Sequence, residues 1–275
     1  MDAPITERTR DSAEVAAPRP AAARRFRGVP LRLLIPNLIT LLALCLGLTA
    51  IRFALENHIE WAVMAIAIAA VLDGLDGRIA RALKGTSRFG AELDSLADFV
   101  DFGVAPALVL YVFSLGEMKS LGWFAALIFA IACALRLARF NVMIDDPNRP
   151  KWQSQFFVGM PAPAGAIAGL LPVYLHLSFL HLPLSPALTP FEIAYVLAIA
   201  SLMASRVPHF SGKSIGRVPR EYVAVVLFML AAGILLLANF PLEMLATMTV
   251  VYLASIPFSV RRFERMRRAE GEDEA

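Results

Sequence analysis

The sequence predicts an all-α protein: a polytopic integral membrane helical bundle with about eight transmembrane helices. Its 275 residues are 58% hydrophobic and its mean hydropathy is +0.63, more than the core of a soluble domain requires. The apolar residues also form runs close to the roughly 20 residues that a helix needs to cross a bilayer. The runs cover residues 36–55, 61–81, 91–113, 121–140, 158–176, 191–203, 222–239 and 242–259.

The basic residues support this arrangement independently. Lys and Arg near the ends of membrane helices are retained on the cytoplasmic side. With the runs above, all of the 26 Lys and Arg residues except Arg52 and Lys119 fall on one side of the membrane. That side includes both termini, which are therefore predicted to be cytoplasmic. Because these charges follow the membrane topology, we expect the lipid bilayer and no nucleic acid as a partner.

The chain divides into three predicted parts. Residues 1–30 are rich in Arg, Ala and Pro without an apolar run, so we expect a disordered basic cytoplasmic tail. Residues 31–260 form one membrane domain, and residues 261–275 form a charged cytoplasmic tail. Cys45 and Cys133 each fall inside a predicted span, which argues against a disulfide framework.

The segment 73–101 places carboxylates beside long apolar runs, where they are costly and mark functional sites. Asp73 and Asp76 are three residues apart and Asp94 and Asp98 are four apart, so each pair shares one face of a helix. Four converging anions would repel one another, so either several are protonated or cations lie among them, and metal is the simpler explanation. Oxygen ligands without nearby His or Cys suit two divalent ions, Mg²⁺ or Mn²⁺, and such a pair suits displacement at phosphorus.

Small and basic residues lie between the two acid pairs. Gly77, Ala80 and Gly90 would permit close approach by a flat ligand, and Arg81 would hold phosphate. Residues 73–98 read DGLDGRIARALKGTSRFGAELDSLAD, which matches D-x-x-D-G-x-x-A-R-x8-G-x3-D-x3-D at every fixed position. This pattern resembles the signature of the CDP-alcohol phosphatidyltransferase family.

The resemblance implies a role for each matched position. Asp73, Asp76, Asp94 and Asp98 would be metal ligands, and Asp98 would also be the catalytic general base that takes the proton of the acceptor hydroxyl. Gly77, Ala80, Arg81 and Gly90 would shape the nucleotide and phosphate pocket. Asp101 lies outside the signature, and we expect it to support the site and not to bind metal.

Further polar residues are candidates for substrate contacts. Asn37 enters the first span and would either contact the nucleotide or cap the helix. Arg136 and Arg139 lie three residues apart at the end of the fourth span, close to Asn141. Two Arg side chains on one face would bind a carboxylate, which serine carries and choline lacks. The alternative is that both Arg residues only anchor the helix end.

The stretch LRLARFN at 135–141, with residues 157–164 and 202–213, looks like the phosphatidylserine synthase branch of that family. The resemblance implies transfer of the phosphatidyl group from CDP-diacylglycerol to L-serine, giving phosphatidylserine and CMP. It also implies a possible homodimer, an active site facing the cytoplasm and a bacterial inner membrane as location. His209 and Lys213 are expected to be interfacial.

Two alternatives stay open at this stage. The same chemistry would serve another acceptor, such as glycerol 3-phosphate, inositol phosphate or choline. A cation-coupled membrane transporter would also place acidic residues in the membrane. Against a transporter, the acids gather in one Gly-rich segment at one end of two helices.

Overall fold

The computed structural model describes residues 31–83, 87–144, 156–178, 183–210 and 222–273. The predicted amino-terminal tail, residues 1–30, lies outside the described residues, as does Lys213. At the other end, the last helix runs without interruption to Asp273, so no helix end marks the expected boundary at residue 261.

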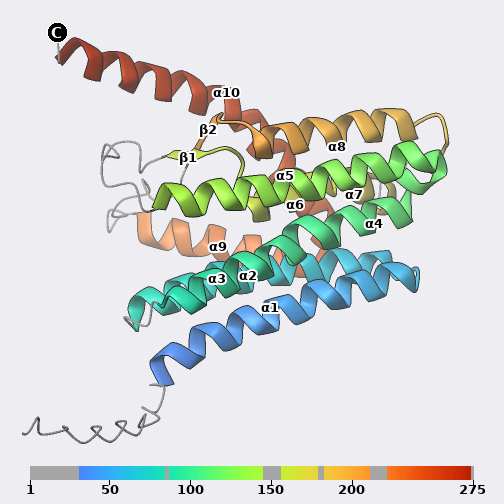
Figure 1. Ribbon diagram of the computed structural model, residues 1–275, viewed down its shortest axis with the longest axis horizontal. Helices are drawn as coiled ribbons and strands as arrows, with labels where there is room; N and C mark the ends of the chain where they lie inside the picture. Colours follow the sequence, from blue (N-terminus) through green and yellow to red (C-terminus); the bar gives the residue numbers. More distant parts are fainter. Residues whose placement is uncertain (1–30, 84–86, 145–155, 179–182, 211–221, 274–275) are drawn as a thin grey trace, which may run out of the picture.

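Helices account for nearly all of the described chain (Figure 1). They are α1 (Leu31–Leu55), α2 (Ile59–Ala82), α3 (Arg88–Phe99), α4 (Ala105–Phe113), α5 (Ser120–Ile144), α6 (Ala162–Gly169), α7 (Leu171–Leu177), α8 (Thr189–Ala204), α9 (Val223–Asn239) and α10 (Pro241–Asp273). A π-helical segment, Val100–Val104, joins α3 to α4, and a 3-10 turn, Leu115–Met118, precedes α5. Each predicted apolar run coincides with one of these helices or with a consecutive pair.

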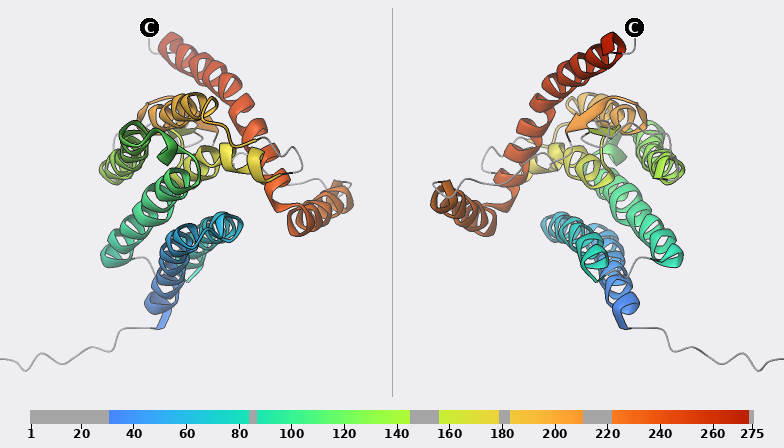
Figure 2. Two further views of the ribbon diagram at one scale, coloured as in Figure 1. Left: turned by 90° about the vertical axis from the view of Figure 1, so that its right-hand side faces the viewer. Right: turned by 90° about the vertical axis from the view of Figure 1, so that its left-hand side faces the viewer.

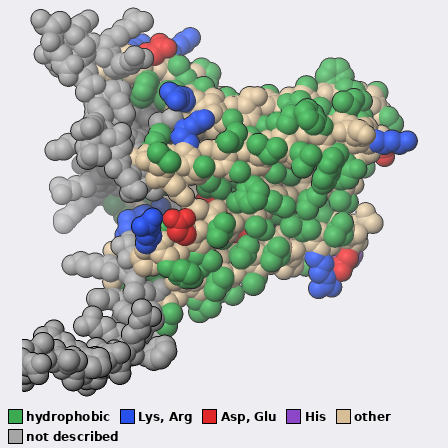
Figure 3. All heavy atoms as spheres, viewed as in Figure 1, with side chains coloured by type: hydrophobic (Ala, Val, Ile, Leu, Met, Phe, Trp, Pro, Cys, Tyr) green, Lys and Arg blue, Asp and Glu red, His purple; other side chains and the backbone are tan. Residues whose placement is uncertain are grey.

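Several of these helices are suited to a bilayer. Within the described residues, four segments are long and apolar enough to cross a membrane: Leu34–Leu55, Arg88–Phe113, Ser120–Met143 and Pro241–Met266. Three further apolar helices are shorter: Ala162–Leu177, Thr189–Ala204 and Val223–Asn239. Figure 3 shows hydrophobic side chains across the middle of one face, with charged side chains towards its two ends. The predicted fold class, a polytopic helical membrane protein, is confirmed.

The structure differs from the expected elements in two places. Helix α1 begins at Leu31 and contains Pro36, although the first run was predicted to begin at that proline. A two-stranded antiparallel ribbon of β1 (Phe156–Val158) and β2 (Pro208–Phe210) was not predicted. Its strands have three residues each, too few to show a period-2 pattern in the sequence.

The predicted span 158–176 is broken into α6 and α7 because of Pro172, the second residue of α7. Proline has no N–H to pair with the carbonyl four residues earlier. That carbonyl, on Ala168, instead accepts a hydrogen bond from the hydroxyl of Tyr195 at 2.7 Å. The break therefore leaves no unpaired carbonyl there and connects α6 to α8.

Small side chains allow close packing at the start of the bundle. Helices α1 and α2 pack along their length, and the alanines that they bury include Ala43, Ala50, Ala54, Ala62, Ala65 and Ala69. Small residues are the common means by which helices approach one another in a membrane. Figure 2 shows α9 apart from the core, next to α10. The site described below therefore depends mainly on α1 to α8.

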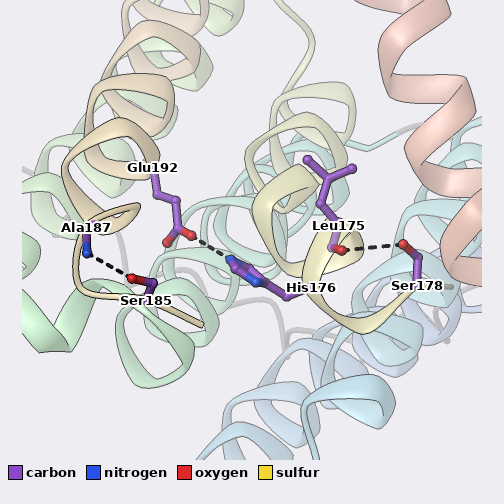
Figure 4. Close-up of polar contacts among 6 residues, drawn as sticks. All are labelled: Leu175, His176, Ser178, Ser185, Ala187 and Glu192. Atoms are coloured by element: carbon purple, nitrogen blue, oxygen red, sulfur yellow. Dashed lines mark hydrogen bonds and ion pairs between the residues drawn. The ribbon is translucent and has the colours of Figure 1, made fainter. Parts of the chain in front are cut away.

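A buried pair of side chains, His176 and Glu192, joins two helices of the bundle (Figure 4). The Nε2 atom of His176 in α7 lies 2.7 Å from Oε1 of Glu192 in α8, and both side chains are almost fully buried. Glu192 lies in the first turn of α8, whereas the last turn of that helix ends at Ala204. The His176 and Glu192 pair thus connects α7 to α8 at the opposite end.

Replacing Gly169 with Val tests the packing of α6 on α5. A Cβ at this position would lie 2.7 Å from Cε2 of Phe129, a fully buried side chain that has no room to move. We expect Gly169→Val to lower the unfolding free energy by about 1–3 kcal/mol, measured by thermal unfolding in detergent. Gly233→Val is the control, because a Cβ at 233 meets nothing within 4 Å. Equal stability of the two variants would contradict this packing.

Candidate active site

Three carboxylates converge between α2 and α3. Asp73 and Asp76 project from the last turns of α2, and Asp94 projects from α3. Each offers an oxygen within 4.8 Å of the oxygens of the other two. Asp98, one turn further along α3, lies within hydrogen-bond reach of Asp73 but outside this group of three. Asp76 is only 4% exposed. The structure thus brings all four predicted acids together, with Asp98 at the edge.

Local contacts set this arrangement. Ser87 caps α3, and its hydroxyl accepts a hydrogen bond of 3.0 Å from the backbone N–H of Gly90. A Cβ at position 90 would lie 2.8 Å from Oδ1 of Asn37, so a larger residue there would displace the Asn37 side chain. The hydroxyl of Thr40 in α1 donates to Oδ2 of Asp76 at 2.7 Å. Helix α1 therefore orients the acidic cluster from one side.

The donor set fits hard divalent cations. All three groups are carboxylates, which suit Mg²⁺ or Mn²⁺ and not zinc. Among the described residues no Lys or Arg forms a close ion pair with them, although Arg136 interacts electrostatically with Asp73. Three adjacent carboxylates still repel one another unless cations or protons offset their charge. Asp73, Asp76 and Asp94 can therefore hold a divalent ion.

A first cavity, of about 420 Å³, opens between α1, α2 and the start of α3. Its lining includes every residue predicted to contact nucleotide or phosphate: Asn37, Gly77, Ala80, Arg81 and Gly90. We call it the α1 cavity. The lining also contains Thr40, Asp76 and Asp94, so this cavity reaches the acidic cluster.

A second cavity, of about 330 Å³, lies between α2, α3, α5 and the start of α6, and we call it the α5 cavity. Asp73, Asp98, Arg136 and Asn141 line it. The two cavities share part of their walls: Asp76, Gly77, Arg81, Ala91 and Asp94. Two ligands, one in each cavity, would therefore meet at the carboxylates.

Arg136 brings a positive charge to the α5 cavity. Its guanidinium carbon lies 5.7 Å from the centre of the Phe140 ring, and it interacts electrostatically with Asp73 and Asp98. No hydrogen bond holds the guanidinium to another residue in the described part of the chain. Asn141, also in the lining, donates from Nδ2 to the hydroxyl of Ser95 at 2.9 Å. The donors of Arg136 are therefore available to an anion in this cavity.

Arg139 has a different environment from Arg136. Its Nη1 atom donates to the carbonyls of Ala204 at 2.7 Å and Ser205 at 3.1 Å. These carbonyls end α8, where backbone acceptors lack helical partners. Arg139 is not among the residues that line either cavity. Arg139 thus binds the end of α8. It does not join Arg136 in a site that would bind one carboxylate between two Arg side chains.

Thr40 and Ser95, which bond to Asp76 and Asn141, were not predicted as site residues. Thr40 lies three residues after Asn37 on the same helical face, and that spacing was an available signal. Asp101, in the π-helical segment, is 1% exposed, packs against Gly47 and is not in the lining of either cavity. Its role in supporting the site stays a prediction.

Comparison with known proteins gives consistent matches. The model of the CDP-alcohol phosphatidyltransferase family matches residues 33–204, which include all the residues of both cavities. The CDP-diacylglycerol–serine O-phosphatidyltransferase of Mycobacterium leprae is 43% identical over 239 residues, which cover 86% of this chain and 77% of the relative. Proteins with the same name from Mycobacterium bovis and Helicobacter pylori are 43% and 32% identical, covering 86% and 80% of this chain and 82% and 88% of the relatives.

Thr40→Val tests whether α1 orients the acidic cluster for metal. The change removes the donor to Asp76 with little change in volume, and loss of such a supporting contact typically weakens metal affinity by about 10–100-fold. Titration of the purified protein with Mn²⁺, followed by electron paramagnetic resonance, measures this. Thr49→Val is the matched control, since its hydroxyl donates to the carbonyl of Cys45 away from the site. Unchanged Mn²⁺ affinity in Thr40→Val would contradict the assigned role.

Proposed function

Because the chain belongs to the CDP-alcohol phosphatidyltransferase family, we propose that it transfers the phosphatidyl group of CDP-diacylglycerol to L-serine, giving phosphatidylserine and CMP. The family predicted from the signature at residues 73–98 is confirmed. Membership of an enzyme family also removes the reason to consider a cation-coupled transporter.

One observation carries the proposal: the two cavities meet at the acidic cluster. A donor with a pyrophosphate would lie in the α1 cavity, with the cytidine towards Asn37 and Gly90 and the phosphates towards Arg81 and the carboxylates. An acceptor would enter the α5 cavity. The shared wall would bring the acceptor hydroxyl to the phosphorus atom that carries diacylglycerol.

Arg136 favours serine as the acceptor. A carboxylate matches a guanidinium with free donors, and the pairing is stronger in a water-poor site. Glycerol 3-phosphate and inositol phosphate carry anions as well, whereas choline carries none. The relatives named as serine transferases support serine over the phosphorylated acceptors. Arg139 is left out of the acceptor site that we propose, because its Nη1 is bound to the end of α8.

Asp98 is the proposed general base. It lines the α5 cavity, so its carboxylate can take the proton from the serine hydroxyl. The serine oxygen forms a bond to the phosphorus atom attached to diacylglycerol, and the bond from that phosphorus to the oxygen shared with CMP breaks. CMP leaves with that oxygen and its negative charge, and Asp98 then releases the proton to water.

Divalent ions held by Asp73, Asp76 and Asp94 would neutralise the phosphate oxygens and the charge that develops on departing CMP. Arg81 belongs to the lining of both cavities, so it can bind the same phosphate group from the side. Gly77 leaves the wall open here, because even a Cβ would meet only the Arg81 side chain, at 3.6 Å.

We also propose in which membrane the protein lies and which side of that membrane its active site faces. The apolar helices indicate an integral membrane protein. The excess of Lys and Arg on the side that carries the site supports a cytoplasmic active site, cytoplasmic termini and, for a chain with bacterial relatives, the inner membrane. A homodimer is part of the proposal on family grounds.

CMP release tests the function. Purified protein in detergent receives CDP-diacylglycerol, Mn²⁺ or Mg²⁺, and either L-serine, glycerol 3-phosphate, inositol phosphate or choline. We expect CMP release that depends on serine and stops when EDTA removes the metal. Release with a different acceptor would overturn the serine assignment and retain the family chemistry. Release that continues in EDTA would contradict the metal role of the acidic cluster.

Asp98→Asn tests the general base. The amide cannot take a proton, so we expect kcat to fall by about 10²–10⁴-fold while CDP-diacylglycerol affinity changes little. Glu92→Gln is the control, because Glu92 is an exposed acid on the same helix outside both cavities. Full turnover by Asp98→Asn, or equal loss in both variants, would exclude the role assigned to Asp98.

A further inference from the structure

The last turn of α8 is bound by residues from two other parts of the chain. Arg139 of α5 donates from Nη1 to the carbonyl oxygens of Ala204 at 2.7 Å and Ser205 at 3.1 Å. The carbonyl of Leu202 accepts from the Ser205 hydroxyl at 2.8 Å and from the backbone N–H of Met160 at 3.3 Å. The last carbonyls of a helix have no partners within that helix. Arg139 and the segment before α6 therefore supply partners that α8 itself cannot.

The ribbon of β1 and β2 extends this connection beyond the end of α8 (Figure 1). The backbone N–H of Gly159 donates to the carbonyl of Val207 at 2.9 Å. Gly159 has a φ of +79°, and a Cβ there would lie 2.7 Å from the carbonyl oxygen of Ser205, so the position requires glycine. The segment that leads into α6 is thus held against the segment that leaves α8.

The side chain of His209 in β2 strengthens the ribbon. It is 1% exposed, so the expectation that His209 is interfacial was wrong. Its Nδ1 lies 2.8 Å from the carbonyl oxygen of Val207 and must donate to it. The His209 ring also stacks on Tyr252 of α10, with ring centres 5.9 Å apart. The carbonyl of Val207 therefore accepts one bond from Gly159 and another from His209.

The start of α6 packs directly on the end of α8. Gly165, in the first turn of α6, lies against Met203 of α8, because a Cβ at 165 would lie 2.5 Å from Sδ of this fully buried side chain. Pro161 precedes α6, and its carbonyl accepts from the backbone N–H of Gly165 at 2.8 Å. The position of Pro161 and of the first turn of α6 therefore depends on the end of α8.

The same part of the chain lines the α5 cavity. Pro161 and Pro163 belong to its lining, and the remaining lining residues lie on α2, α3 and α5. We call these two residues the proline wall. Proline has no N–H, and the carbonyl of Pro161 is already bound to Gly165. The proline wall therefore acts on a ligand through its shape.

We propose that Arg139 is a positioning residue: by binding the end of α8 it fixes the proline wall, and so sets the size of the acceptor that the α5 cavity admits. This rests on the proposed function, which makes the α5 cavity the acceptor site. Without Arg139 the carbonyls of Ala204 and Ser205 lose their partner, and the segment that carries the proline wall loses its support. Serine has a single CH2OH side chain, and a bulkier amino acid meets the proline wall.

Arg139→Gln tests the inference when L-serine is compared with L-threonine, which carries one more methyl group beside the hydroxyl. CMP release gives kcat/KM for each amino acid. We expect the unmodified protein to favour serine by about 10–200-fold, and Arg139→Gln to reduce this ratio about tenfold. The KM for CDP-diacylglycerol should stay within about twofold, because Arg139 lines neither cavity.

The ratio distinguishes this role from two others. If Arg139 bound the acceptor carboxylate itself, Arg139→Gln would lower kcat/KM for both amino acids equally, because both carry the same carboxylate. If Arg139 only stabilised the end of α8, the unfolding temperature would fall and the ratio would stay the same.

Arg52→Gln is the matched control, because Arg52 forms an exposed ion pair with Glu56 and lines neither cavity. We expect its ratio to be unchanged. Pro163→Ala alters the proline wall itself and leaves the bonds of Arg139 intact, so its ratio should also fall. In the Pro163→Ala background, Arg139→Gln should lower the ratio by less than it does alone, since its effect passes through the proline wall.

An unchanged ratio in Arg139→Gln or in Pro163→Ala would overturn the positioning role. So would an equal fall in Arg52→Gln, or an undiminished effect of Arg139→Gln in the Pro163→Ala background. Failure of the proposed function is distinguishable, because it would appear in the unmodified protein as CMP release that does not depend on serine.

Discussion

The repulsion among carboxylates placed within membrane helices is the constraint on which the rest of the site depends. Asp73, Asp76 and Asp94 meet within 4.8 Å of one another. No described basic side chain forms a close ion pair with them, although Arg136 interacts electrostatically with Asp73. Such a cluster is stable only if cations or protons offset its charge, and carboxylate oxygens suit divalent ions. The adjoining cavities are where such ions would contact phosphate.

Each helix around the acidic cluster supplies different residues to the site. Helix α1 supplies Thr40, which donates to Asp76, and Asn37, and both residues line the α1 cavity. Helix α5 supplies Arg136 to the α5 cavity, and α8 keeps Arg139 away from it. Because α2 and α3 lie between, the same carboxylates line both cavities. Two cavities that meet at one set of carboxylates suit an enzyme that joins a lipid-linked phosphate to a small polar alcohol, because each substrate can bind in its own cavity.

Much of this could be predicted from the sequence. Apolar runs located every helix, and the spacing of residues 73–98 identified the acids and the α1 cavity residues. Local patterns could not separate Arg136 from Arg139, since three-residue spacing puts both on one face and the end of α8 decides their partners. The ribbon and the burial of His209 depend on contacts between distant segments.

The central claim is that divalent ions at the acidic cluster join a nucleotide in the α1 cavity to an acceptor in the α5 cavity. A crystal structure with CDP-diacylglycerol and Mn²⁺, using anomalous scattering to locate manganese, tests it most directly. The account predicts manganese among Asp73, Asp76 and Asp94, with the cytidine towards Asn37 and Gly90. Manganese elsewhere, or the cytidine beside Arg136, would contradict it.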